Sequence, residues 1–470
     1  MQKVITRFAP SPTGKPHVGN IRTAIFAYLW AKHNKGHFLL RIEDTDQERL
    51  VPESLKYIEE SLAWLGIDFD QEIIYQSKRK EIHQKYANDL LKSKRAYKCF
   101  CTKERLEKLR ENQIKKKMPP GYDGLCRNLT KEELLAKKDA SYVIRFKMPK
   151  NGVAKWDDKI RGEMKINFDI SDDPIILKTD GFPTYHLASV VDDHELKITD
   201  VIRGEEWISS TPKHLALYEA LGWQPPGFAH MPHINGPDGS KLSKRHGDTA
   251  LLDYRAQGYL PEAIFNFLAL LGWNDGTEKE IFEKKELIKS FNLKRIGKSP
   301  AVFDIKKLDW MNGHYIRNLT TEQLKNKIIK LLPGSKITKL KNLDRILEVE
   351  KTRLVVLCDI EKETDFYLDA PKYGAKLLIF KKSNKTDTLK GLTETLQYFE
   401  AERWPDTVKG LNLSLGNVAA NHNLSNGDVF WPARVALSGL EKSPSPAELL
   451  WVLGKKESLK RIKKAINLLK

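Results

Sequence analysis

The chain has 470 residues, and at the usual ~150 residues per domain this length indicates about three domains. Hydrophobic residues make up 40% of it and charged residues 30%, a balance that excludes a disordered or fibrous protein. The formal net charge of +18 suits a polyanionic partner such as a nucleic acid, although an acidic protein or a membrane surface would also fit the charge alone.

The cysteine count and the apolar runs bear on the cellular compartment. Four cysteines are too few for a disulfide scaffold, which favours a reducing environment. The first residues lack the apolar segment of a secretion signal, and no apolar run approaches the ~20 residues that cross a bilayer. We therefore expect a cytoplasmic protein without membrane association.

The N-terminal segment reads as strand, loop, helix and strand. Residues 4–9 are mostly apolar, residues 10–14 break that run, apolar residues recur at helical spacing from Val18, and residues 38–42 are apolar again. This order is the βαβ unit of a parallel sheet, which binds ligands beyond the carboxyl ends of its strands. The polar residues at that edge are Arg7, Ser11, His17 and Glu43.

The pattern changes twice along the rest of the chain. Residues 76–181 differ in composition and hold three of the four cysteines, which indicates an insertion, and a mixed helix and strand pattern returns over residues 184–207. Beyond residue 251 the apolar positions follow the helical period. We predict an α/β fold: a doubly wound, Rossmann-type nucleotide-binding domain with an α/β insertion, followed by all-α regions. The expected boundaries are residues 1–80 and 182–250 for the nucleotide-binding domain, 81–181 for the insertion, 251–320 for a helical connecting domain and 321–470 for an all-helical domain.

Residues 10–20 (PSPTGKPHVGN) form the first candidate site. The N-terminus of the helix that begins here offers free N–H groups and the positive end of the helix dipole, which together hold phosphate. Gly19 lets a ligand approach the backbone, and His17 can donate a hydrogen bond to a phosphate oxygen. Read alone, the segment also fits a proline-rich turn with a surface histidine.

Residues 241–247 (KLSKRHG) form the second. Lys241, Lys244 and Arg245 place three cations on a loop that follows a turn-rich segment. Such a loop can close over a triphosphate and stabilise the charge that builds as diphosphate leaves. Read alone, it also fits a solvated basic loop or a nucleic-acid patch.

These two segments resemble the two ATP-binding signatures of class I aminoacyl-tRNA synthetases. Further segments, nearly from end to end, resemble the bacterial glutamyl-tRNA synthetase family more narrowly. Those segments are residues 7–14 (RFAPSPTG), 41–46 (RIEDTD), 183–188 (PTYHLA), 191–194 (VDDH), 201–207 (VIRGEEW) and 451–455 (WVLGK).

The resemblance implies a two-step reaction. Glutamate attacks the α-phosphorus of ATP, giving glutamyl-adenylate and diphosphate, and the glutamyl group then passes to the 2′-hydroxyl of the terminal adenosine of tRNA(Glu). It also implies Mg²⁺ on the phosphates, a monomer, an insertion that binds the acceptor stem, a connecting domain that contacts the stem and a C-terminal domain that binds the anticodon. The implied ATP-binding residues are His17, Gly19, Asn20, Lys241, Ser243 and Lys244, of which His17, Lys244 and, more weakly, Lys241 are catalytic.

An anionic amino acid in a buried pocket needs charged partners. Arg7 in an apolar strand and Arg203 at the end of another are suitable carboxylate clamps, and which of them takes the side-chain carboxylate stays open. Ion pairing within the domain for Arg7, and packing for Tyr185, are the alternatives. Ser189 stands where many family members carry asparagine, so we assign it no contact. The implied glutamate-binding residues are Arg7, Ala9, Ser11, Glu43, Tyr185 and Arg203, with Glu43 on the ammonium and with Ser11 and Tyr185 as hydrogen-bond partners.

Cys99, Cys101 and Cys126 resemble the zinc knuckle of some family members. Those members have a histidine two residues after the last cysteine, where this chain has Asn128. Three thiolates without a fourth ligand make a poor zinc site, although Tyr122 or a more distant residue would complete one. We expect a metal-free insertion.

Arg353 resembles an arginine that reads the third anticodon base in discriminating family members, and the alternative is an exposed helix arginine. It favours strict use of tRNA(Glu), although a form that also charges tRNA(Gln) stays open. A glutamylating enzyme for a modified tRNA base is shorter, and a glutaminyl-tRNA synthetase has a β-barrel anticodon part. A non-catalytic RNA-binding relative would not need His17, Lys244 and Glu43 together.

Overall fold

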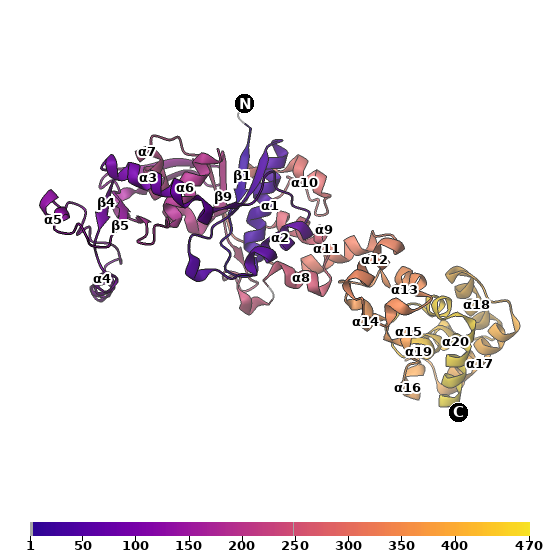
Figure 1. The fold of residues 1–470 in the computed structure, drawn as a ribbon. Coiled ribbons are helices and arrows are strands. Elements are labelled where there is room, and N and C mark those ends of the chain that lie inside the picture. The colour runs from indigo at the N-terminus through magenta and orange to yellow at the C-terminus, as the bar shows by residue number, and fades with distance from the viewer. Residues whose placement is uncertain (1–2, 248) are drawn as a thin grey trace. The chain divides into compact units, whose positions relative to one another are not determined.

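The computed structural model describes residues 3–247 and 249–470, apart from the side chain of Lys244. The chain divides into two compact units. The first comprises Met1–Tyr254 and Ile264–Ile305, and the second comprises Arg255–Ala263 and Lys306–Lys470. Figure 1 shows the elements of both units.

The first unit is built on parallel strands. β1 (Ile5–Phe8) pairs with β2 (His37–Ile42), and β2 pairs with β3 (Ile74–Tyr75). On the other side of β1, the backbone N–H of Thr199 donates to the carbonyl of Ile5 at 2.9 Å, just before β9 (Asp200–Gly204), which pairs with β10 (Gly227–Met231). The parallel strands thus follow the order β3-β2-β1-β9-β10, which confirms the predicted doubly wound fold and places its switch point between β1 and β9.

Helices connect these strands, and their buried faces follow from the sequence. α1 (Val18–His33) buries Ile21, Ala24, Ile25 and Leu29, which recur at helical spacing. The remaining helices of this part are α2 (Ser54–Trp64), α6 (Tyr185–Glu195) and α7 (Thr211–Ala220).

The stretch between β3 and α6 contains two small sheet systems. β4 (Ala96–Cys99), β5 (Val143–Phe146) and β8 (Ile175–Leu177) form an antiparallel sheet beside α3 (Lys80–Lys92). α4 (Lys103–Lys115) and α5 (Lys131–Leu135) lie between β4 and β5 in the chain. The hairpin of β6 (Val153–Asp158) and β7 (Gly162–Asn167) instead extends the nucleotide-binding sheet, because β6 pairs in parallel with β10.

The remainder of the chain is mostly helical, as the apolar period predicts. The two-residue pair β11 (Ile234–Asn235) and β12 (Ala301–Val302) closes the first unit, and residues 306–470, all of them described, contain no strand. The helices are α8 (Leu251–Gln257), α9 (Pro261–Leu270), α10 (Lys284–Ser290), α11 (Ile305–Arg317), α12 (Thr321–Leu331), α13 (Leu343–Glu350), α14 (Asp359–Glu363), α15 (Asp365–Leu368), α16 (Ala375–Leu378), α17 (Lys385–Ala401), α18 (Val408–Asn421), α19 (Asn426–Ser438) and α20 (Pro446–Leu469). Across the described residues, no helix is both long and apolar enough to cross a membrane.

The core of the second unit depends on close helix packing at Gly391 of α17. A Cβ atom at this position would lie 2.0 Å from the backbone carbonyl oxygen of Asp428 in α19, a distance at which the two helix backbones must separate. At Gly416 of α18, by contrast, a Cβ atom would meet nothing within 4 Å.

We therefore expect Gly391→Ala to destabilise the helical unit by about 1–3 kcal/mol, the usual effect of overpacking a core. Gly416→Ala is the matched control and should stabilise the unit by about 0.5–1 kcal/mol, because alanine restricts the unfolded chain. Urea unfolding of the full chain, followed by circular dichroism, measures both. Equal stability of the two variants would contradict the close approach.

Candidate active site

A cavity of about 240 Å³ lies at the carboxyl ends of β1, β2 and β9, where a parallel sheet is expected to bind its ligand. Its lining includes all six predicted glutamate-binding residues, together with Asn20 of the first ATP-binding segment. The lining residues are Arg7, Phe8, Ala9, Pro10, Ser11, Thr13, Asn20, Thr23, Glu43, Tyr185, Ile202, Arg203, Gly204, Glu206 and Trp207.

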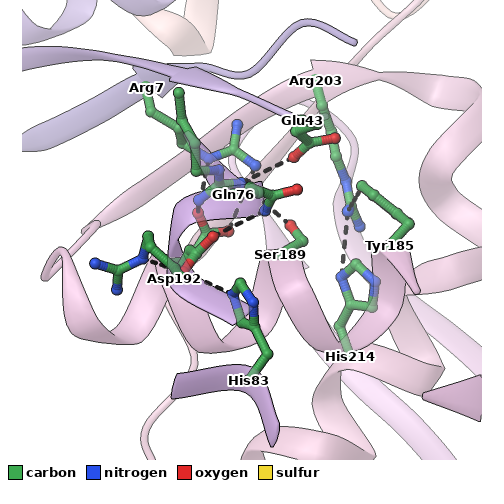
Figure 2. A network of polar contacts seen from close by, with 12 residues as sticks. Arg7, Glu43, Gln76, His83, Tyr185, Ser189, Asp192, Arg203 and His214 are labelled. Atoms are coloured by element: carbon green, nitrogen blue, oxygen red, sulfur yellow. Dashed lines mark hydrogen bonds and ion pairs between the residues drawn. The ribbon is translucent and has the colours of Figure 1, made fainter. Parts of the chain in front are cut away.

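A buried ion cluster holds one wall of this cavity. The Nε atom of Arg7, a residue that is 4% exposed, lies 3.0 Å from Oδ1 of Asp193 on α6. The same oxygen lies 2.6 Å from Nη1 of Arg41 on β2, and Nη2 of Arg41 donates to Glu43 Oε1 at 3.0 Å. Figure 2 labels Arg7 and Glu43 of this cluster. Arg7 thus lines the cavity and also forms the internal ion pair that we considered as its alternative role.

The cluster sets the ionisation of its carboxylates. Burial raises the pKa of Glu43, and the guanidiniums of Arg41 and Arg7 offset part of that rise. Burial also opposes ionisation of Asp193, but Arg7 and Arg41 outweigh it and hold the pKa of that carboxyl below its usual value.

The second arginine of the cavity, Arg203, lies on the other side of the view in Figure 2. Its Nη1 atom donates to the hydroxyl of Tyr185 at 3.1 Å, and burial raises the pKa of that hydroxyl. Arg7 and Arg41 pair with the carboxylates of Asp193 and Glu43, so the one positive charge left over at the cavity is that of Arg203, which forms no ion pair among the described residues. Glu206 also lines the cavity, but it is exposed, so water screens its charge.

The two predicted ATP-binding segments lie side by side. The backbone N–H of Val18 donates to the carbonyl of Thr249 at 2.8 Å, and that of Leu251 donates to the carbonyl of Pro16 at 3.1 Å. These bonds bring the end of the 241–247 loop to the start of α1. Burial and then the charge of Lys241 lower the pKa of His17, so its imidazole is neutral.

The cap of α1 fixes which nitrogen of His17 carries the proton. Nδ1 accepts a hydrogen bond from the backbone N–H of Gly19 at 3.0 Å, so the proton is on Nε2, where it can be donated. In the loop, the N–H of Ser243 donates to His246 Nδ1 at 3.0 Å, and Arg245 pairs with Asp238 at 3.2 Å. The side chain of Lys244 lies outside the described part of the chain.

Comparisons with known proteins agree with this arrangement. Residues 3–310 match a family model described as the catalytic domain of class I tRNA synthetases (E and Q), and residues 320–466 match one described as an anticodon binding domain. A glutamate–tRNA ligase of Clostridium botulinum (strain Loch Maree / Type A3) is 46% identical over 100% of this chain and 99% of its own. That of Clostridium tetani is 44% identical over 100% and 98%. The chain belongs to the glutamate–tRNA ligase family of class I aminoacyl-tRNA synthetases.

Solved structures support the same fold over the whole chain. A glutamate tRNA ligase from Elizabethkingia meningosepticum, in complex with its amino acid, has a TM-score of 0.90 and 37% identity, and the match covers 100% of both chains. The glutamate-tRNA synthetase of Elizabethkingia anophelis has a TM-score of 0.88 and 36% identity, with coverage of 99% and 100%. The alternative with a β-barrel anticodon region is wrong for this chain, because residues 306–470 are helical.

The structure brings the three candidate zinc ligands together. The sulfur atoms of Cys99, Cys101 and Cys126 lie within 4.8 Å of one another. The hydroxyl of Tyr122 lies 3.4 Å from the sulfur of Cys99 and 3.7 Å from that of Cys101, so it stands where a fourth ligand would. The expected metal-free insertion stays a prediction, and the zinc content of the purified protein tests it.

Arg353 lies just after α13 and is held between two carboxylates. Its Nε atom is 3.3 Å from Glu350 Oε2, and its Nη2 atom is 3.2 Å from Glu363 Oε2. Burial raises the pKa of Glu350 to about 7, and the charge of Arg353 opposes that rise. The side chain of Arg353 is 32% exposed, so this arginine is both oriented by the two carboxylates and accessible to solvent.

Sequence reasoning missed Arg41, Asp193 and the role of Asp192. Arg41 interrupts an apolar strand, as Arg7 does, and this signal could have found it. Ser189, which we left unassigned, is buried and does not line the cavity, and its Oγ lies 3.5 Å from Nη2 of Arg41. Asp192 faces the insertion and is bonded to Gln76, Arg79 and His83, of which Figure 2 labels Gln76 and His83. Burial opposes the ionisation of this carboxyl, but the hydrogen bond from His83, the charge of Arg41 and the hydrogen bond from Arg79 lower its pKa to about 2.

Because Arg41 is fully buried between Asp193 and Glu43, we expect Arg41→Met to destabilise the protein by about 3–5 kcal/mol, the usual cost of leaving a buried charge unpaired. Lys92→Met, which removes the exposed ion pair with Asp89, is the control and should change stability by less than about 1 kcal/mol. Urea unfolding compares the two. Similar losses would show that the cluster contributes no more than a surface pair.

Proposed function

We propose that this chain is a glutamate–tRNA ligase that acts in the cytoplasm as a monomer. It activates L-glutamate with ATP to give glutamyl-adenylate and diphosphate, and it transfers the glutamyl group to the 2′-hydroxyl of the 3′-terminal adenosine of tRNA(Glu). The observation that carries this proposal is the cavity in which Arg7, Arg203, Glu43 and Tyr185 converge at the switch point of a class I catalytic fold.

The charge of the cavity favours glutamate over glutamine. Glutamate carries two carboxylates and one ammonium, so its charge of minus one cancels the single positive charge left at the cavity, that of Arg203. Glutamine has no net charge and would leave that positive charge buried and unpaired, which is unfavourable in a site removed from water. Glu43 binds the ammonium, Arg7 and Arg203 face the carboxylates, and Ser11 and Tyr185 supply hydrogen bonds.

The activation step requires positioning and charge stabilisation. An oxygen of the glutamate α-carboxylate forms a bond to the α-phosphorus, and the bond between that phosphorus and the diphosphate oxygen breaks. His17 donates its Nε2 proton in a hydrogen bond to a phosphate oxygen, while Lys241 and Lys244 stabilise the charge on the leaving diphosphate. Gly19, Asn20 and Ser243 complete the ATP site, and Mg²⁺ enters with ATP as part of the substrate.

The rest of the chain serves the tRNA. The net charge of +18 suits contact with an RNA backbone. We assign residues 81–181 to the acceptor stem, 251–320 to contacts with the stem and 321–470 to the anticodon, where Arg353 reads the third base.

The decisive experiment measures labelled glutamate on purified tRNA(Glu) and tRNA(Gln) with ATP and Mg²⁺. We expect charging of tRNA(Glu) alone, because Arg353 is oriented to donate to one base edge. Arg353→Gln should reduce the preference for tRNA(Glu) by about 10-fold, the usual effect of one lost bidentate contact. Charging of both tRNAs by the unmodified protein would remove the reading role of Arg353. Tight tRNA binding without charging would support a non-catalytic relative.

The raised pKa of Glu43 predicts how the kcat/KM for glutamate depends on pH. Only the ionised carboxylate binds the substrate ammonium, so affinity is lost as the pH falls through a folded-state pKa that lies above the ordinary value of 4.5. We expect the kcat/KM for glutamate to fall on acidification at a higher pH than an ordinary carboxyl would give. Glu43→Gln should weaken glutamate binding and remove this acidic limb. An unchanged pH profile in that variant would assign the limb to another group.

A further inference from the structure

Arg203 is a buried cation with no anionic partner in the part of the chain that the structure describes. It is 5% exposed and occupies the penultimate position of β9. Within residues 3–247 and 249–470 it forms no ion pair with a carboxylate, whereas Arg7 and Arg41 both pair with Asp193. A buried guanidinium without a counter-ion is costly, so its surroundings require an explanation.

The hydrogen-bonding capacity of Arg203 is nevertheless filled. A guanidinium has five N–H donors, and each of them faces an uncharged acceptor. The acceptors are His230 Nε2 at 3.0 Å, Tyr185 Oη at 3.1 Å, His214 Nδ1 at 3.3 Å, Thr211 Oγ1 at 2.9 Å and the Trp207 carbonyl at 3.3 Å. The five bonds fix the orientation of the guanidinium without cancelling its charge.

Two histidines can accept from a cation only while they are neutral. For His230, Nδ1 lies 2.6 Å from Asp158 Oδ2, so this nitrogen carries the proton and Nε2 is free to accept. Burial lowers the pKa of His230, the hydrogen bond to Asp158 offsets part of this effect, and the charge of Arg203 adds to it. Asp158 is therefore separated from Arg203 by the imidazole ring.

His214 is arranged in the same way. Its Nδ1 faces Arg203, and its Nε2 lies 3.2 Å from Nδ1 of His186, so the proton is on Nε2 and points away from the arginine. Burial and then the charge of Arg203 hold the pKa of His214 well below its usual value. Burial likewise lowers the pKa of His186 to about 4.

We propose that His214, His230 and Thr211 are positioning residues that orient Arg203 through uncharged acceptors, so that its charge stays uncancelled until a substrate carboxylate enters the cavity. This inference rests on the proposed function, because it takes glutamate as the anionic ligand. Their uncharged state, rather than their size alone, is the property that the substrate requires. A carboxylate at position 214 or 211 would form an ion pair with Arg203 and so compete with the substrate carboxylate.

The test compares substitutions of matched size that differ in charge. His214→Gln offers Arg203 an amide oxygen, and His214→Glu offers it a carboxylate of the same length. Glutamate binding is measured by calorimetry, and the KM values for glutamate and ATP are measured with tRNA present. We expect His214→Gln to keep the glutamate Kd within about 3-fold and His214→Glu to weaken it at least about 30-fold, the effect of competing for a buried charge. The KM for ATP should change little in both.

Thermal unfolding shows whether His214→Glu folds. If it does not, a second pair of variants, at Thr211, tests the same proposal. Thr211 begins α7, where an acidic side chain is favoured by the helix dipole, so Thr211→Asp should be tolerated. Thr211→Asn is its uncharged counterpart. We expect the same division between the charged and the uncharged variant.

Weakened glutamate binding in the charged variants alone supports the proposal. Equal weakening within each pair would show that these residues only pack against Arg203, and unchanged binding in the charged variants would also overturn the inference. Failure of the proposed function has a different signature, namely an unmodified protein that binds glutamate in calorimetry but forms no adenylate with tRNA and ATP. In that case the glutamate Kd values of the charged and uncharged variants can still be compared, and they still test the inference.

Discussion

The site depends on the two ion pairs that the carboxylate of Asp193 forms. It stands on α6 and pairs with Arg7 on β1 and with Arg41 on β2, so one side chain joins a helix to two adjacent strands. Three ions buried together are tolerated only if each satisfies the others, which leaves them few arrangements. The position of α6 against the sheet is thereby fixed, and with it the position of Tyr185 in its first turn and of Glu43 beside Arg41.

The neighbouring residue extends this constraint toward the insertion. Asp192 faces away from Asp193 and binds Gln76, Arg79 and His83, which lie on the segment that leads from β3 into α3. Two consecutive aspartates of one helix therefore hold the cavity wall on one side and the entry to the insertion on the other. A shift of α3 cannot occur without changing the contacts of Asp192, which is next in sequence to the aspartate that holds Arg7.

How much of this the sequence predicted depends on the range of each interaction. The βαβ unit, the turn that leads into α1 and the helical second unit follow from local sequence patterns, and resemblance to a family supplied the six cavity residues. Asp193, by contrast, contacts Arg41 across 152 positions, and no local pattern identifies such a partner. The same holds for β6, whose residues resemble an insertion in composition but pair with β10, because sheet pairing depends on strands that are distant in the chain.

The two cavity arginines illustrate why residue type alone does not define a role. Arg7 shares Asp193 with Arg41, so part of its charge is already compensated, but its Nη1 atom has no partner among the described residues and remains able to donate. Arg203 is in the opposite situation, because its N–H donors all have acceptors while its positive charge has no counter-ion among the described residues. Arg7 can therefore contribute a directional hydrogen bond, whereas Arg203 contributes the electrostatic attraction of its uncompensated charge. A buried cation held by uncharged groups violates the rule that buried charges are paired, and such violations are expected where a ligand supplies the missing partner.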